Sequence, residues 1–279
     1  MPVAATSTSQ VSQPLRMVTP PIERPRRVPW QIRRIRGDRD TSLAREPSVP
    51  HHGPMTSRRS PARADLVRDA CAAFGAVLDG LGDDDSWAAT GCPGWSVRDL
   101  THHCAMDALR GLVALHTPTT ARPDRDAATY WTDWGGDPAG AAEARRHTRV
   151  AASMVLDWEP VRALHRETTR ALVHAAQHCG DGAVRTQGHV LRVEDLLSTL
   201  AVEATVHHLD LIQHLDGSPG PAVDGLAEVR RVLTDLWERE PLEHWSDEHF
   251  ARVGTGRAEL TAQERAELGA HADLLPLFS

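Results

Sequence analysis

Three residues that are suited to hold one metal ion stand far apart in this chain. His103 lies in GCPGWSVRDLTHHC, eight residues after Trp95, and Glu203 and His207 lie in the later segment LLSTLAVEATVHHLDLIQHL. Because Glu203 and His207 are four positions apart, a helix places them one above the other on one face. Two imidazoles and a carboxylate can hold a divalent ion. Three protein ligands leave one coordination position open, which is typical of catalytic zinc.

Each of these ligands also has a structural interpretation. His103 considered alone could be an ordinary helical histidine on a partly buried face, because residue type does not distinguish it from the adjacent His102. Glu203 and His207 could form an exposed ion pair on a solvated helix. The leucines around them, Leu196, Leu200, Leu211 and Leu215, argue against full exposure. Ionisable side chains on a core-facing stripe must be paired or metal-bound, and this conflict is the strongest physical indication of a site.

Two further residues are candidates for a catalytic role. Asp210 follows His207 by three positions and either orients a ligand imidazole or forms a helix-terminal hydrogen bond or salt bridge. Arg257 ends the segment Gly-Thr-Gly-Arg, and a guanidinium suits bidentate binding of a substrate carboxylate. The alternative for Arg257 is a salt bridge that ties the C-terminal segment to the helices.

Other common catalytic motifs do not occur. The sequence has no Gly-Lys-Ser/Thr phosphate loop, no Gly-x-Ser-x-Gly elbow and no Gly-x-Gly-x-x-Gly. Cys104 follows His103 directly, but adjacent helical residues do not face each other. We therefore interpret Cys104 as a core cysteine and not as a nucleophile.

The order of these motifs resembles the mycothiol-dependent maleylpyruvate isomerase family, within the DinB-like superfamily of metal-binding four-helix bundles. The resemblance rests on Trp-Ser-Val-Arg-Asp-Leu-x-x-His at 95–103, Glu-x-x-x-His-x-x-Asp-Leu at 203–211 and Gly-Thr-Gly-Arg at 254–257. It covers roughly residues 65–278. It implies an all-α fold, a divalent metal on His103, Glu203 and His207, and mycothiol as co-substrate. We expect zinc, with nickel and iron as alternatives.

The resemblance also implies a reaction. A zinc-bound thiolate of mycothiol would attack a small electrophilic substrate, giving thiol transfer or cis–trans isomerisation. The alternatives are a metal-dependent hydrolase that uses bound water and a non-catalytic metal-binding bundle, because a fold does not fix the chemistry. The resemblance further implies that a C-terminal domain helps to bind the thiol, and the segment after Gly217 is short for a full domain of that type.

Composition limits the partners. Residues 1–64 carry 12 arginines and 4 acidic residues, a balance of +8, whereas residues 65–279 carry 19 arginines and 34 acidic residues, a balance of −15. An acidic body argues against nucleic-acid binding. No apolar run is long enough for a membrane span. Four cysteines without a Cys-x-x-Cys pair indicate the cytoplasm. We expect a monomer or homodimer, and the lysine-free, arginine-rich composition suits a GC-rich actinobacterial source.

We divide the chain into a disordered Pro/Arg-rich tail at 1–63, a metal-binding helical bundle at 64–216 and a C-terminal helical extension at 217–279. Prolines interrupt the tail, and Met55 is an alternative start. Apolar periodicity predicts helices over 64–81, 97–116, 141–156, 194–215 and 226–240, another from Asp157, and a last one after a capping box at Thr261. Residues 117–140 read as a loop, and residues 188–193 as a short extended segment.

Overall fold

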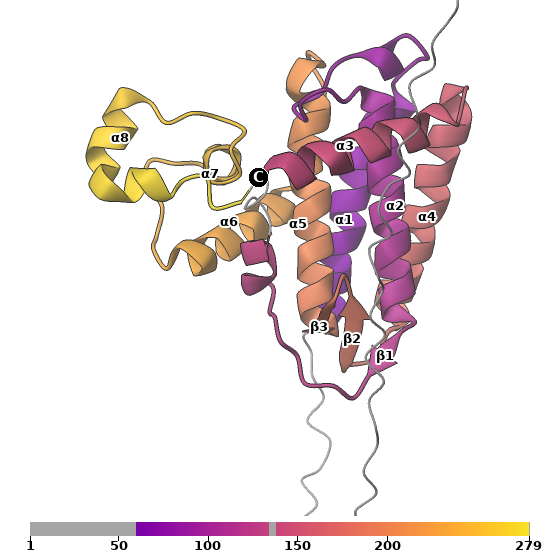
Figure 1. Ribbon diagram of the computed structural model, residues 1–279, viewed down its shortest axis with the longest axis horizontal. Coiled ribbons are helices and arrows are strands. Elements are labelled where there is room, and N and C mark those ends of the chain that lie inside the picture. Colours follow the sequence, from indigo (N-terminus) through magenta and orange to yellow (C-terminus); the bar gives the residue numbers. More distant parts are fainter. Residues whose placement is uncertain (1–59, 134–137, 279) are drawn as a thin grey trace, which may run out of the picture. The chain divides into compact units, whose positions relative to one another are not determined.

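The computed structural model describes residues 60–133 and 138–278 and is mainly helical. The predicted tail at 1–63 lies almost wholly outside these ranges. Four long helices run side by side: α1 (Ser60–Asp79), α2 (Val97–Leu115), α4 (Trp158–His178) and α5 (Val193–Leu211) (Figure 1). Both α1 and α2 pack against α4 and α5. The expected all-α four-helix bundle is confirmed.

The bundle helices begin close to where the sequence predicts them. Ser96 caps α2, with a reciprocal capping box between Ser96 and Asp99. Asp157 is the N-cap residue of α4. The predicted C-terminal ends were less accurate. Helix α1 ends at Asp79 rather than at Leu81, and α5 ends at Leu211 rather than at Leu215. In place of its last predicted turn the chain forms the 3₁₀ turn η3 (Ile212–His214).

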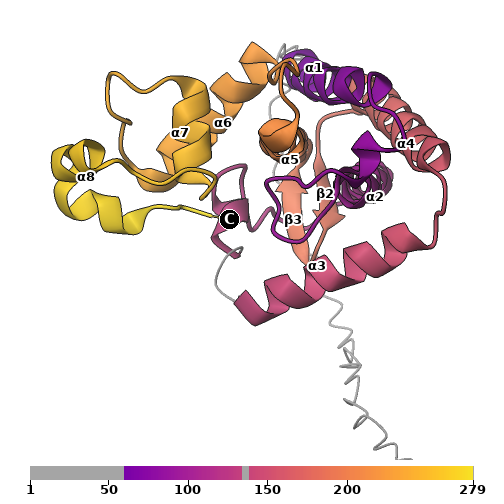
Figure 2. The ribbon, with the colours of Figure 1, turned by 90° about the horizontal axis from the view of Figure 1, so that it is seen from above.

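Between α2 and α4 the chain is more structured than the predicted loop. The 3₁₀ turn η2 (Thr129–Asp133) precedes α3 (Pro138–Ser153), which lies across α2 (Figure 2). Helix α3 was expected at 141–156 and begins and ends three residues earlier. A shorter 3₁₀ turn, η1 (Asp85–Trp87), lies between α1 and α2.

A small antiparallel sheet closes one end of the bundle. Its strands are β1 (Pro118–Thr119), β2 (Ala183–Thr186) and β3 (His189–Arg192), in the order β1-β2-β3. Gln187 and Gly188 form the two-residue turn between β2 and β3, both with positive φ, as a right-twisted hairpin requires. Only the segment of β3 was expected, because β1 and β2 are too short for a periodic signal.

The C-terminal segment contains α6 (Val223–Trp237), α7 (Asp247–Gly254), α8 (Ala262–Leu268) and the 3₁₀ segment η4 (Gly269–Leu274). The Thr261 capping box at the start of α8 is confirmed. Helix α7 was not predicted, because its eight residues are too few for a clear period. Helix α6 packs against α5 and α7.

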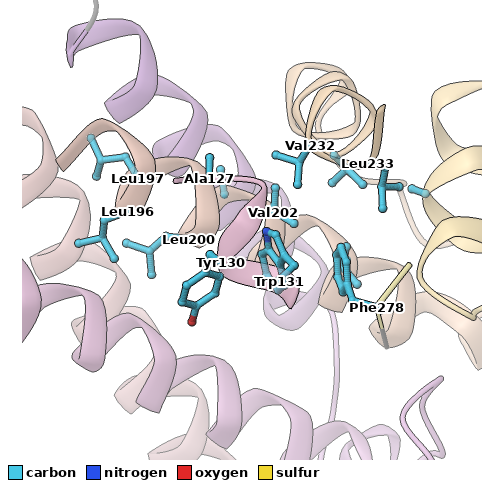
Figure 3. Packing of buried hydrophobic residues seen from close by; sticks show 14 of the residues in the cluster. Ala127, Tyr130, Trp131, Leu196, Leu197, Leu200, Val202, Val232, Leu233 and Phe278 are labelled. Carbon is cyan, nitrogen blue, oxygen red and sulfur yellow. The ribbon is translucent and has the colours of Figure 1, made fainter. Parts of the chain in front are cut away.

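The core continues from the bundle into this C-terminal segment. Leu196 and Leu200 of α5 belong to the same buried cluster as Val232 and Leu233 of α6 (Figure 3). The rings of Trp131 and Phe278 stack with their centroids 4.3 Å apart. The remaining members shown in the close-up include Ala127, Tyr130, Leu197 and Val202. The predicted division at residue 216 stays a prediction. Within the ranges that the structure describes, none of the helices has the length and hydropathy of a membrane span.

Candidate metal centre

The start of α2 positions His103. The Ser96 cap fixes where the helix begins, and His103 follows two turns later on the side that carries Trp95. The rings of Trp95 and His103 lie 5.0 Å apart between centroids. The indole Nε1 of Trp95 donates a 3.1 Å hydrogen bond to the carbonyl of Arg145 in α3. The eight-residue spacing between Trp95 and His103 thus has a physical basis, since Trp95 forms a wall beside the imidazole.

Helix α5 supplies the other two side chains. His103 Nε2 lies 3.1 Å from His207 Nε2, and His207 Nε2 lies 3.4 Å from Glu203 Oε2. One ligand atom of each residue lies within 4.8 Å of the others. Metal–ligand distances of about 2.0–2.2 Å in a tetrahedral site place two ligand atoms about 3.3–3.6 Å apart. The two measured pairs, His103–His207 and His207–Glu203, already have nearly this spacing, and His103 and Glu203 lie within 4.8 Å of each other, so the donor set fits a divalent cation.

The pKa shifts of Glu203 and His103 favour the protonation states that bind a metal ion. Burial raises the pKa of Glu203, but contact with His207 and the charges of His207, His103 and Arg110 outweigh it and lower that pKa to about 2. Burial, together with the neighbouring His207, lowers the pKa of His103 to about 4. At neutral pH the site therefore offers an ionised carboxylate and a neutral imidazole, the forms that bind metals.

A second set of groups lies behind His207. His207 Nδ1 is 3.0 Å from Asp210 Oδ2, and Cys92 Sγ is 3.2 Å from the same oxygen. Burial opposes protonation of His207, yet its contacts with Asp210, Cys92 and Glu203 raise its pKa well above the ordinary value. Without a cation these contacts favour the imidazolium form of His207, with Asp210 accepting the proton on Nδ1, and a bound cation would replace the proton on Nε2, which faces His103 and Glu203.

Arg257 holds Asp210 in place. Its Nε and Nη2 donate to the two carboxylate oxygens of Asp210 at 2.8 and 2.7 Å, and Nη1 donates to the carbonyl of Thr255 at 2.9 Å. This geometry matches the salt bridge that the sequence offered as an alternative for Arg257. The side chain of Asp210 is 1% exposed, so the pair is almost dry. Burial raises the pKa of Asp210, but His207 and Arg257 outweigh it and hold that pKa far below its usual range.

The structure therefore brings all five predicted residues together along the C-terminal half of α5: His103, Glu203, His207, Asp210 and Arg257. Two histidines near them in sequence lie elsewhere. His208 points away, and its Nε2 donates a 2.9 Å hydrogen bond to the carbonyl of Pro219, as expected for a residue about 100° further round the helix. His214, expected near the rim, is exposed in η3.

The sequence analysis missed Cys92, Asp107 and Arg110. Asp107 follows His103 by four positions, the same spacing as Glu203 to His207, and this signal was available. Asp107, Glu203, His207 and Cys104 line a cavity of about 30 Å³ inside the bundle. Cys92 forms with His207 and Asp210 a second group of potential ligand atoms. Nothing in the local sequence of Cys92 indicates that contact, because its partner lies 118 positions away.

A comparison of the sequence with models of known families gives a match. The family model described as the mycothiol maleylpyruvate isomerase N-terminal domain matches residues 67–212, which include His103, Glu203 and His207. The chain belongs to this family. The family is named after an enzyme, an isomerase. The arrangement of α1, α2, α4 and α5 agrees with a DinB-like helical bundle. The match ends before α6, so Arg257 lies outside it.

Two solved structures are also similar to this chain. One is described as the crystal structure of the mycothiol-dependent maleylpyruvate isomerase, with 18% sequence identity and a TM-score of 0.47 over 64% of this chain and 70% of that one. The other is a histidine-to-alanine mutant of that isomerase, with 17% identity, the same TM-score and the same coverage. The comparison with curated proteins gave no match.

Proposed function

We propose that the protein is a metal- and mycothiol-dependent enzyme, a thiol transferase or a cis–trans isomerase, that acts on a small electrophilic substrate. The observation that carries this proposal is the convergence of His103, Glu203 and His207 in a member of the mycothiol maleylpyruvate isomerase family. We expect zinc, because two imidazoles and a carboxylate suit it. We expect the enzyme to act in the cytoplasm, as a monomer or homodimer.

The open ligand set supports an enzyme rather than a structural metal site. Among the residues described, no fourth histidine, cysteine or carboxylate joins the group of His103, Glu203 and His207. A structural zinc has four protein ligands, whereas a catalytic one leaves a position for substrate. When bound, the cation lowers the pKa of a thiol near it, so that mycothiol reacts as a thiolate at neutral pH.

The residues around the ligands would orient them and keep water out. Asp210 fixes the Nδ1 proton of His207, and Arg257 and the packed loop at Cys92 keep Asp210 in position. The side chains of His207 and Glu203 are 12% and 19% exposed, so a ligand can reach them while bulk water is limited. A preorganised, poorly hydrated site strengthens charge interactions with a reacting group.

The chemistry that fits this site begins with addition of the mycothiol thiolate to an electrophilic double bond. The former double bond becomes a single bond, and rotation about it followed by loss of the thiolate gives the isomerised product. With a leaving group on the substrate, displacement by the thiolate would instead leave the sulfur on the product. Both outcomes use the same nucleophile and the same ligand set.

The test is metal analysis followed by calorimetric titration of the zinc-loaded protein with mycothiol in buffers of different ionisation enthalpy. Thiolate formation should release a proton, which the buffer comparison detects. His207→Ala should remove most zinc affinity, and Glu203→Gln should weaken it. The matched controls are His147→Ala and Glu143→Gln, because Glu143 and His147 form an exposed pair with the same four-residue spacing on α3.

Two results would count against the proposal. Equal zinc binding by His207→Ala and the unchanged protein would remove the proposed ligand set. Zinc binding without any mycothiol binding would refute the thiol mechanism and favour the hydrolase or the non-catalytic bundle.

A further inference from the structure

Arg110 lies on the same face of α2 as the candidate ligand His103. It follows His103 by seven positions, two helical turns, and Asp107 lies between them at four. Arg110 Nε donates to Asp107 Oδ1 at 2.8 Å, and Nη1 donates to Thr186 Oγ1 of β2 at 3.1 Å. The guanidinium is thus anchored from two elements at a fixed position near the candidate metal centre.

The donors of Arg110 are only partly used. Nη2 lies 2.7 Å from Asp107 Oδ1 but has no hydrogen-bond partner of suitable geometry among the described residues. Nη1 carries two N–H groups, and its hydrogen bond to Thr186 uses one of them. Arg257 differs, because both edges of its guanidinium are occupied by Asp210 and Thr255. Of the two arginines at this site, Arg110 is the one that can bind another acceptor.

The Arg110 side chain is partly exposed and is hydrogen-bonded to Asp107, which lines the cavity, although the Nη2 atom of Arg110 is itself buried. The side chains of Arg110 and Asp107 are 17% and 15% exposed, close to the values for Glu203 and His207. Asp107 lines the same small cavity as Glu203 and His207.

The local charge balance determines which ligand this position favours. Without a cation, the guanidinium of Arg110 is balanced by the carboxylate of Asp107, and the position offers no excess positive charge to an anion. With a divalent cation on His103, Glu203 and His207, the balance becomes positive, and a carboxylate can lie between the cation and the guanidinium. Guanidinium groups favour carboxylates because the two planar groups match in geometry.

We propose that Arg110, held by Asp107 and Thr186, forms an anion subsite that binds a carboxylate of the electrophilic substrate. This inference deepens the proposed function and rests on it for the cation. Asp107 is a positioning residue in this scheme: it fixes the guanidinium and competes with the substrate carboxylate for it.

The test uses zinc-loaded protein and maleate as the probe, with the uncharged maleic diamide as the comparison ligand, in calorimetric titrations. Arg110→Gln should weaken maleate binding by about ten- to hundredfold, as expected for loss of a hydrogen bond to a charged group. It should leave the affinity for the diamide unchanged. Arg162→Gln is the matched control, because Arg162 and Glu159 form an i,i+3 pair of the same kind on α4.

A second variant distinguishes a binding role from a structural one. Asp107→Asn should tighten maleate binding by about tenfold, since the guanidinium loses its competing carboxylate. A residue needed only for folding would not produce this gain. If Arg110→Gln fails to fold, the double variant Asp107→Asn/Arg110→Gln replaces it, because it removes both charges of the pair and leaves neither unpaired. The double variant should show the same weakening of maleate binding, about ten- to hundredfold.

The outcomes separate this inference from the proposed function. Unchanged maleate affinity in folded Arg110→Gln, or weaker binding by Asp107→Asn, would overturn the anion subsite. If zinc binds and maleate binding depends on Arg110 while mycothiol does not bind, the subsite stands and the thiol mechanism fails. If the unchanged protein binds no zinc, the ligand set fails before maleate is added, and the subsite fails with it.

Discussion

Replacing Asp210 by Asn should affect both stability and metal affinity, because this carboxylate pairs with Arg257 and contacts His207. The Asp210 and Arg257 side chains are 1% and 16% exposed, and their two contacts measure 2.7 and 2.8 Å. Removing one partner of a buried pair leaves an uncompensated charge and costs about 3–5 kcal/mol. For a domain of this size that corresponds to a fall in Tm of about 6–20 °C.

The same change should weaken zinc binding. Loss of the carboxylate that fixes the proton on His207 Nδ1 typically lowers metal affinity by about 10–100-fold. Arg257→Met should lower Tm by a similar amount but affect zinc less, since Asp210 still contacts His207. The double variant Asp210→Asn/Arg257→Met should recover part of the lost stability, because no unpaired charge remains.

The assays are thermal unfolding by circular dichroism and zinc titration by calorimetry. Asp235→Asn is the control, because it breaks an exposed pair with Arg231 and should cost at most about 1 kcal/mol. The reasoning is refuted if Arg257→Met keeps its Tm and only raises the thiol KM. That result would show that Arg257 binds substrate. Unchanged zinc affinity in Asp210→Asn would show that Asp210 does not orient His207.

Three further predictions concern other parts of the chain. Gly91→Ala should destabilise the protein by about 1–3 kcal/mol and weaken zinc binding, because a Cβ there would lie 3.0 Å from Asp210 Cα; thermal unfolding and zinc titration check this. Glu264 has a pKa lowered to about 2, because hydrogen bonds from Thr261, His249 and Trp245 outweigh its burial. Its stabilising contribution is present above its ordinary pKa of about 4.3 and should be lost as pH falls from about 4.5 to 2, a dependence that Glu264→Gln should reduce in acid unfolding curves. A chain that begins at Met55 should keep its helicity and Tm, and a large loss of either would show that residues 1–54 pack against the rest.

Much of the fold was predictable, because the bundle helices carry long apolar periods and clear end signals. The Ser96 and Thr261 capping boxes are local patterns, and the structure contains both. Helix α7 and strands β1 and β2 were missed for the opposite reason: they are short, and contacts with distant segments stabilise them. Local propensity is a weak guide for such elements.

The candidate site likewise has a part that the sequence predicts and a part that only the tertiary structure determines. The spacing of Glu203 and His207 on one helix, and the family pattern that includes His103, determined which residues could share a metal ion. Only the tertiary structure decided the contacts of the groups around them: Arg257 with Asp210, and Cys92 with the same carboxylate. These partners lie 47 and 118 positions apart. Their contacts depend on how the C-terminal segment and the loop before α2 pack against the end of α5, and no local periodicity in the sequence encodes that packing.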